Sequence, residues 1–223
     1  MIDLNSMERR DTLQGHLLAV SALASLDGGK RLVSGSHDTF IRIWNPTNGM
    51  CDAVLGGHSG TIGALFVRCT GSSATGDPGR KEEASIVSGS GDATVRVWGR
   101  TCEDSGETWA CVAVLEGHRH GVWAANGSPA TGIIATGGGD ATVKVWAPTS
   151  SSSFARVAEA RAVRDDKRLV DERGRSPGWE CVGGVRGTIG AVGAVLITED
   201  ALLFGTSEAL IARFPLQSCM PVP

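Results

Sequence analysis

The sequence contains one fourteen-residue pattern three times, and this repetition limits the possible folds more than any other feature. The copies read RLVSGSHDTFIRIW at 31–44, SIVSGSGDATVRVW at 85–98 and IIATGGGDATVKVW at 133–146. Each copy has a short β-branched run, a turn of small residues containing Asp, and an alternating apolar run that ends in Trp. Turns of this composition favour tight connections. The pattern therefore predicts three two-stranded hairpins, each with one buried face.

A Gly-His pair stands upstream of each hairpin, at Gly15-His16, Gly57-His58 and Gly117-His118. The closing Trp follows the His after 28, 40 and 28 residues. This arrangement resembles the WD-repeat (WD40) β-propeller family, whose repeat runs from a Gly-His pair to a closing Trp. The resemblance extends over most of the chain, from about Asp11 to Phe214. It implies an all-β propeller whose blades have four antiparallel strands around a central channel.

The resemblance also implies a buried, hydrogen-bonded tetrad in each blade, formed by His, a hydroxyl residue, Asp and Trp. The positions are His16, Ser34, Asp38 and Trp44; His58, Ser88, Asp92 and Trp98; and His118, Thr136, Asp140 and Trp146. A buried polar group without a partner costs roughly 1–3 kcal/mol, so four linked groups satisfy one another. A hydrolase triad uses similar residue types, but catalysis needs one site and not three with a Trp in each. We therefore expect structural tetrads and no catalytic residue.

A fourth copy of the hairpin has lost the tetrad. The segment 201–214 reads ALLFGTSEALIARF, and the four tetrad positions hold Val185, Phe204, Glu208 and Phe214. Losing all four together is coherent, because a partly satisfied polar network destabilises the fold. The sequence predicts a fourth blade with apolar contacts in place of the tetrad.

The spacing of the motifs gives the predicted boundaries. We expect an N-terminal outer strand at 1–15, blades at 16–57, 58–117 and 118–148, and a degenerate blade at 179–223. A polar, Gly-rich insertion occupies 70–83, and a charged, Ser-rich loop occupies 149–178. Four blades of roughly 40 residues fall short of the seven that are usual in the family. We predict an incomplete propeller, with a small closed ring or a partial sequence as the alternatives.

Composition excludes several classes of function. A net charge of −3 gives no support for direct nucleic-acid binding, and no apolar run approaches the roughly 18 residues of a membrane helix. The six cysteines form no CxxC pair, and Cys51 and Cys111 each stand seven residues before the His of a Gly-His pair. We expect reduced thiols in an intracellular protein, cytoplasmic or nuclear. Metalloprotease and phosphate-binding motifs are absent, so no metal or cofactor is expected.

The resemblance implies a non-catalytic scaffold that binds protein partners in a multiprotein complex, including a chain that would complete the propeller. Family members bind partners on the rim where the hairpin turns emerge. The residues expected on that partner-binding face are Trp123, His37, Thr61 and His120. A large aromatic among small neighbours favours a binding hot spot, and burial of Trp123 within its strand is the alternative.

A narrower resemblance suggests a second function. The segments LEGHRHGVW and ATGGGDATVKVW, followed by LLFGTSEALIARFPL, are similar to a WD-repeat adapter subunit of a tRNA 2′-O-ribose methyltransferase. That reading makes the chain a non-catalytic subunit in RNA modification. A hydrolase built on Ser34 is the third class, and the threefold recurrence of its residues counts against it.

Overall fold

The computed structural model describes residues 12–70, 83–103, 106–128, 131–148, 179–185, 190–198 and 201–215. These residues form four antiparallel sheets. The first contains β1 (Val20–Leu26), β2 (Arg31–Ser36), β3 (Ile41–Asn45) and β4 (Met50–Leu55), with a 3-10 turn, η1 (Asp27–Gly29), after β1. The second contains β5 (Ile62–Thr70), β6 (Glu83–Ser90), β7 (Val95–Glu103) and β8 (Gly106–Leu115). The third contains β9 (Val122–Gly127), β10 (Ile134–Gly138), β11 (Val143–Pro148) and β12 (Trp179–Val185), and the fourth contains β13 (Val192–Ile197), β14 (Ala201–Thr206) and β15 (Ile211–Pro215).

The alternating residues of the repeated pattern explain the hairpins. In the first blade, β2 pairs with β3 so that Gly35 faces Ile41 and Leu32 faces Trp44. Ile41 and Ile43 are fully buried on one face of the sheet, whereas Arg42 points to the other face and is half-buried. Successive strand residues point to opposite faces, so a two-residue period creates one apolar face per blade.

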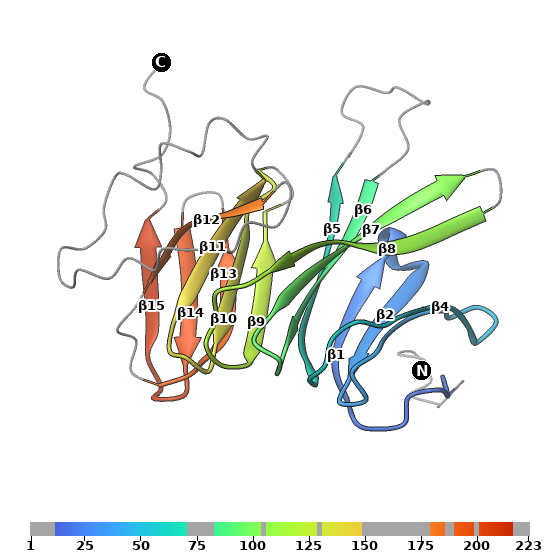
Figure 1. Cartoon of the computed structure of the whole chain (residues 1–223), viewed down its shortest axis with the longest axis horizontal. Coiled ribbons are helices and arrows are strands. Elements are labelled where there is room, and N and C mark those ends of the chain that lie inside the picture. The colour runs from blue at the N-terminus through green and yellow to red at the C-terminus, as the bar shows by residue number, and fades with distance from the viewer. Residues whose placement is uncertain are drawn as a thin grey trace, which may run out of the picture.

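The four sheets follow one another as the blades of an open arc (Figure 1). Their inner strands β1, β5, β9 and β13 lie side by side in sequence order. Within the described ranges, no similar contact joins β13 back to β1, and the first and last sheets stand at opposite ends of the arc in Figure 1. The prediction of an all-β propeller with four blades is confirmed.

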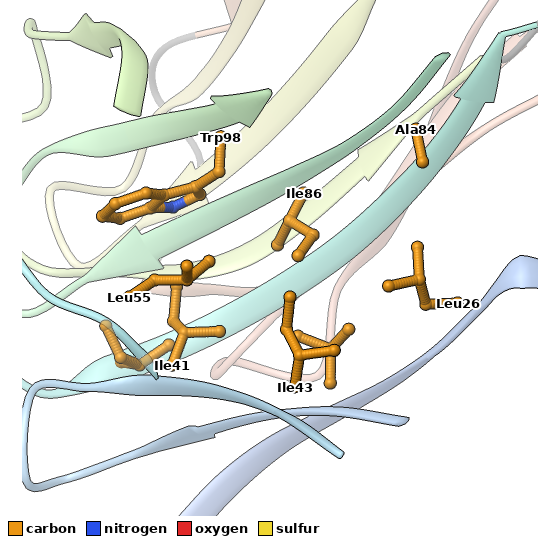
Figure 2. Packing of buried hydrophobic residues seen from close by; sticks show 9 residues of the cluster. Leu26, Ile41, Ile43, Leu55, Ala84, Ile86 and Trp98 are labelled. Carbon is orange, nitrogen blue, oxygen red and sulfur yellow. The ribbon is translucent and has the colours of Figure 1, made fainter. Parts of the chain in front are cut away.

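Apolar side chains fill the space between neighbouring blades. Figure 2 shows the first such core, where Ile41 and Ile43 of the first sheet face Ile86 and Trp98 of the second. The second core joins β7 and β8 to β9–β12, and the third joins β10 and β11 to β13 and β14. Burying one Val, Leu or Ile side chain contributes roughly 1.5–3 kcal/mol. Packing of one blade face on the next therefore holds the arc together.

One boundary differs from the sequence prediction. Strand β12 (179–185) pairs with β11, with Cys181 opposite Trp146, and so it is the outer strand of the third sheet. The spacing of the motifs predicted that 179–223 forms the fourth blade. The chain returns to the same sheet after residues 149–178, so that stretch joins two strands of one blade instead of two blades. Residues 1–11 of the strand predicted at 1–15, residues 71–82 of the insertion predicted at 70–83 and the whole loop predicted at 149–178 lie outside the described residues. Residues 12–15 contain no strand.

Candidate protein-binding face and hydrogen-bonded tetrads

In the second blade four side chains form one hydrogen-bonded row. Trp98 Nε1 donates to Ser88 Oγ at 2.9 Å, Ser88 Oγ lies 2.8 Å from His58 Nε2, and His58 Nδ1 lies 2.9 Å from Asp92 Oδ2. An indole N–H can only donate and an ionised carboxylate can only accept. The neutral imidazole therefore carries its proton on Nδ1 and donates to Asp92, while Nε2 accepts from the Ser88 hydroxyl. The row joins the entry to β5 with β6, its turn and β7.

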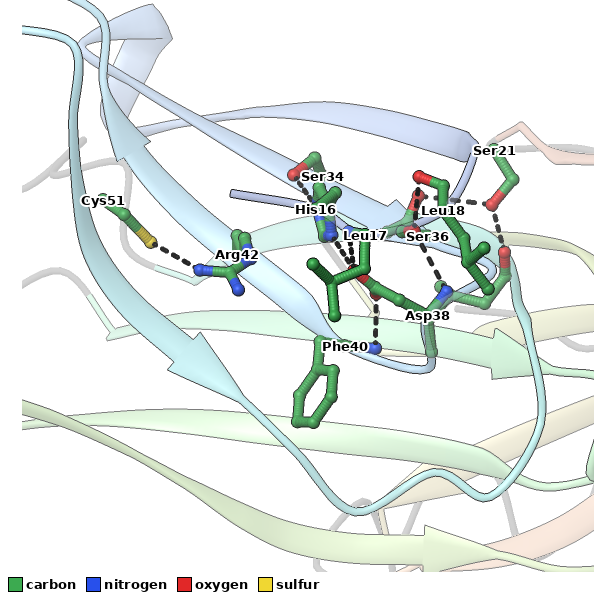
Figure 3. A network of polar contacts seen from close by, with 12 residues as sticks. His16, Leu17, Leu18, Ser21, Ser34, Ser36, Asp38, Phe40, Arg42 and Cys51 are labelled. Atoms are coloured by element: carbon green, nitrogen blue, oxygen red, sulfur yellow. Dashed lines mark hydrogen bonds and ion pairs between the residues drawn. The ribbon is translucent and has the colours of Figure 1, made fainter. Parts of the chain in front are cut away.

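The same row is present in the first and third blades. In the first blade Trp44 Nε1 donates to Ser34 Oγ at 2.7 Å. Figure 3 shows the rest of this row, in which His16 lies 2.7 Å from Ser34 Oγ and 2.8 Å from Asp38 Oδ2. In the third blade Trp146 donates to Thr136 Oγ1 at 2.9 Å. His118 lies 2.9 Å from that oxygen and 3.0 Å from Asp140 Oδ2. The structure thus brings together all twelve residues assigned to tetrads.

Each tetrad carboxylate also organises the backbone around it. Asp92 accepts the backbone N–H of Ser59 at 2.9 Å and that of Thr94 at 2.9 Å. Burial alone would raise the pKa of the Asp92 carboxyl. Hydrogen bonds from Thr94, His58 and Ser59 outweigh burial and hold that pKa well below its usual range. The pKa of Asp140 is also well below its usual range, because bonds from its neighbours likewise outweigh burial.

The tetrads offer no accessible nucleophile. Ser34, Ser88 and Thr136 are 3%, 0% and 0% exposed, and each oxygen is already bonded to both a Trp and a His. Burial also lowers the pKa of His58 below its ordinary value of 6.5, although Asp92 opposes the shift. A buried hydroxyl with both neighbours satisfied cannot reach a substrate. We interpret the three rows as ties between strands.

The fourth blade has an aromatic contact in place of the tetrad. The rings of Phe204 and Phe214 stack with centroids 5.8 Å apart and planes inclined by 14°. Phe204 is buried, Val185 ends β12 half-buried, and Glu208 is exposed on its turn. The pair occupies the positions of the hydroxyl residue and the Trp, so an apolar contact joins β14 to β15 here.

Trp123 is the second residue of strand β9, and 42% of its surface is exposed. Its ring lies across glycines of both the second and the third blade. A Cβ built on Gly121 would lie 2.9 Å from Cε2 of the ring, and one built on Gly63 would lie 3.0 Å from its Cζ3. A Cβ built on Gly139 would lie 3.2 Å from Nε1 of the ring, and one built on Gly91 would lie 3.6 Å from its Cη2. The ring therefore rests on a surface without side chains and keeps the rest of its area open.

The other three predicted face residues are placed differently. Thr61 is half-buried and accepts the Gly91 N–H on its carbonyl at 2.8 Å, so it borders one of the glycines under Trp123. His120 is exposed, and a Cβ built on Gly139 would lie 3.4 Å from the Cβ of His120. His37 is exposed on the equivalent turn of the first blade, where its N–H donates to the Ala19 carbonyl at 2.9 Å. The structure groups Thr61 and His120 with Trp123 and leaves His37 on the first blade.

A cluster of charges that no sequence pattern predicted joins the first two blades. Arg31 Nη1 lies 2.6 Å from Glu107 Oε1, and Arg100 Nη1 lies 2.9 Å from Asp27 Oδ1. The hydrogen bond with Glu107 is the largest influence that raises the pKa of Arg31, and Asp27 adds to it against the opposing effect of burial. Residues 31 and 107 are 76 positions apart, so no local pattern signals this contact.

Three cysteines occupy the equivalent position on the outer strands of three blades, and the sequence spacing indicated this for two of them. Cys51, Cys111 and Cys181 are free and exposed, and each pairs across the sheet with the tetrad Trp of its blade. Arg42 and Arg96 approach the first two sulfurs at 3.7 Å. Among the described side chains, no group of three or more His, Cys, Asp or Glu could hold a metal ion.

Four antiparallel sheets with adjacent inner strands, three of them with the same polar row, define a class of β-propeller protein. The chain belongs to the WD40 repeat family. The sequence model of that family, described as WD domain, G-beta repeat, matches residues 7–45, 49–99 and 109–147, which is more than half of the chain.

Relatives in sequence agree with that membership, and a solved structure shares the fold. The chain is 38% identical over 125 residues to the Probable cytosolic iron-sulfur protein assembly protein 1 of Chaetomium globosum, covering 50% of this chain and 27% of that protein. It is 31% identical over 107 residues to the Ribosome biogenesis protein YTM1 of Eremothecium gossypii, covering 44% of this chain and 21% of the relative. A solved chain described as the structure of U3-55K superposes with a TM-score of 0.64 at 15% identity, over 94% of this chain and 53% of its own length. The chain thus spans about a quarter of the length of these two relatives.

None of the elements in the described ranges is a helix long and apolar enough to cross a membrane.

Proposed function

We propose that this chain is a non-catalytic WD-repeat scaffold that binds protein partners through a face centred on Trp123. The observation that carries the proposal is the exposed indole ring held on the glycines of two blades. Aromatic side chains of this kind dominate the binding energy of many protein interfaces.

The glycine surface prepares Trp123 for binding. A side chain at Gly63 or Gly121 would overlap the ring, so these positions let it lie flat between the blades. A ring that is already held in place loses little conformational freedom when a partner covers it. Thr61 and His120 border the ring and offer polar groups at its edge. The face therefore suits a protein segment that places an apolar side chain on the indole.

The names of the relatives support a role in multiprotein assembly. One is called an assembly protein and another a ribosome biogenesis protein. The chain covers only 27% of the first relative and 21% of the second. The scaffold function of the whole protein is therefore proposed and not inferred from these names alone. The same holds for an intracellular location, cytoplasmic or nuclear, which the word cytosolic in the first name supports. Neither a cofactor nor catalysis is part of this function.

Quantitative affinity capture tests the proposal. The tagged chain, Trp123→Ala and Val112→Ala are each used to recover proteins from the same lysate. Val112 is a matched control because it is 54% exposed but lies on the outer strand β8. Losing a hot-spot aromatic commonly costs 2 kcal/mol or more, or roughly thirtyfold in affinity.

We expect Trp123→Ala to lose the partners that Val112→Ala retains. Equal recovery by all three proteins would contradict the proposal. Specific recovery of a methyltransferase together with tRNA would favour the alternative adapter role in RNA modification.

A further inference from the structure

The three junctions between blades use one repeated contact. At each junction the β-branched residue at the start of an inner strand lies against a glycine of the preceding blade. We call the first residue the knob and the glycine the socket. The pairs are Ile62 on Gly35, Val122 on Gly89 and Val192 on Gly137. A Cβ built on Gly89 would lie 2.6 Å from Val122 Cγ1, and the overlap is tighter at the other two sockets. All three knobs are 0% exposed, so the missing side chain of each glycine creates the space for a knob.

A fourth knob and a fourth socket exist, and no described residue fills either of them. Val20 pairs with Ser36 just before an irregularity in β1, as Ile62 pairs with Ser90 before the one in β5. Val20 is nevertheless 49% exposed. Gly205 pairs with Ile211 as Gly35 pairs with Ile41. Within 4 Å, a Cβ built on Gly205 would meet only Ala194 of its own sheet among the described residues, at 3.8 Å.

The residues around the free knob and the free socket are also exposed where their counterparts in the inner blades are buried or half-buried. Leu23 follows Val20 by three positions and is 67% exposed, whereas its counterpart Leu65 is half-buried beside Gly35. Ile211 is 79% exposed, although Ile41 at the equivalent position is fully buried. Each end of the arc therefore presents the apolar surface that the inner blades bury. Such contiguous apolar surface indicates an interaction site.

We propose that a second copy of this chain covers both ends. Val20 of each copy lies on Gly205 of the other, so that two arcs form one closed ring of eight blades. The chain carries both halves of the contact that it already uses three times. The two halves cannot meet within one chain, because the first and last sheets stand at opposite ends of the arc (Figure 1).

The geometry of closure fits this partner. Eight blades lie within the range of about four to eight that propellers adopt. A head-to-tail contact forms a closed ring when its rotation closes, here after two copies, and otherwise forms an open filament. Arg213 stands where the inner blades carry Ile43 and Val97, so the socket face is not wholly apolar. We therefore expect the contact between copies to be weaker than the internal junctions.

Sedimentation equilibrium of the 223-residue chain over a range of concentrations tests the proposal. The variants are Val20→Asp, which places a charge on the knob, and Gly205→Val, which fills the socket. Both positions have room for the new side chain in one copy. The control is Val112→Asp, on the interior second blade, where the first blade carries Asp52 at the equivalent position.

The chain and the control should reach twice the mass of 23.1 kDa, while each end variant should stay at a single mass. Mixing the two end variants leaves one intact junction, from Val20 of the Gly205→Val copy to Gly205 of the Val20→Asp copy. The mixture should therefore recover part of the association that neither variant shows alone, which also shows that both are folded.

Three results would overturn the proposal. These are a single mass for the unmodified chain at every concentration, a doubled mass that survives Val20→Asp or Gly205→Val, and a series of longer oligomers. Trp123→Ala should associate like the unmodified chain, so the proposed binding face and the proposed ring can fail separately.

Discussion

The carboxylate of Asp92 lies 2.9 Å from His58 Nδ1 and joins the β6–β7 turn to the segment that enters β5. Replacing Asp92 by Ala leaves the imidazole N–H and two backbone N–H groups without their acceptor. An unmet buried donor costs about 1–3 kcal/mol. We expect Asp92→Ala to lower the free energy of unfolding by that amount in denaturant titrations. Asp52→Ala, an exposed change on β4, is the control, and equal stability of the two variants would refute a structural role.

Asp92 and His58 also make the stability of the fold depend on pH. In the fold the pKa of Asp92 lies well below the ordinary 3.8, and that of His58 lies below 6.5. Both groups therefore bind protons more readily in the unfolded chain, and acid favours unfolding. Stability should be greatest above pH 6.5, fall below it as unfolded His58 becomes protonated, and fall further below about pH 4. Thermal unfolding from pH 8 to pH 3 measures this. Asp92→Asn should lose less stability on acidification, and an unchanged acid dependence would contradict the assignment.

A residue with positive φ follows the tetrad Asp in each hairpin turn. Ala93 has φ 67° and Ala141 has φ 56°. The left-handed conformation costs a residue with a Cβ roughly 1–2 kcal/mol, and glycine avoids this cost. Because glycine loses more backbone entropy on folding, only part of that amount appears as added stability. Ala93→Gly should therefore raise the free energy of unfolding by about 0.5–1 kcal/mol. In the exposed strand position Ala110 the same change should lower it, and a loss at both positions would argue against strain in the turn.

The charge cluster between the first two blades should contribute little. Glu107 and Arg31 are partly exposed, at 30% and 17% of their side-chain surfaces. Ion pairs of this kind are typically worth at most about 1 kcal/mol and are weakened by salt. Glu107→Gln should lower the free energy of unfolding by about 0.5–1 kcal/mol, and the loss should shrink at high salt. A double-mutant cycle with Arg31→Met isolates the pair, and a loss that is insensitive to salt would count against this view.

The repeats allowed the strands to be predicted closely. The hairpin predicted at 31–44 is formed by Arg31–Ser36 and Ile41–Asn45, within one residue of the predicted bounds. The alternation of Ile41 and Ile43 also indicated which face would be buried. These features are local, since each blade repeats the same residues at the same distances.

Contacts between blades were harder to predict. The sequence carried one unused signal, because a glycine recurs near the end of the second strand in all four hairpins, at Gly35, Gly89, Gly137 and Gly205. Its meaning appears only when Ile62 is seen to fill the space beside Gly35. The glycines around Trp123 are similar, because they come from two blades and meet only in the folded chain. The boundary at 179 was misplaced because residues 149–178 interrupt the usual distance between a tetrad Trp and its outer strand.

Comparing the stability of Trp146→Ala and Trp123→Ala tests most directly whether Trp123 lies on a binding face and not in the core. Trp146 is 0% exposed and donates to Thr136, whereas Trp123 is 42% exposed on its glycines. Losing a buried Trp typically costs about 3–5 kcal/mol. Thermal unfolding of Trp146→Ala and Trp123→Ala, measured beside the unmodified chain, should show a large loss of stability for Trp146→Ala. Trp123→Ala should unfold near the temperature of the unmodified chain. If Trp123→Ala unfolds as easily as Trp146→Ala, Trp123 belongs to the core and the proposed binding face is wrong.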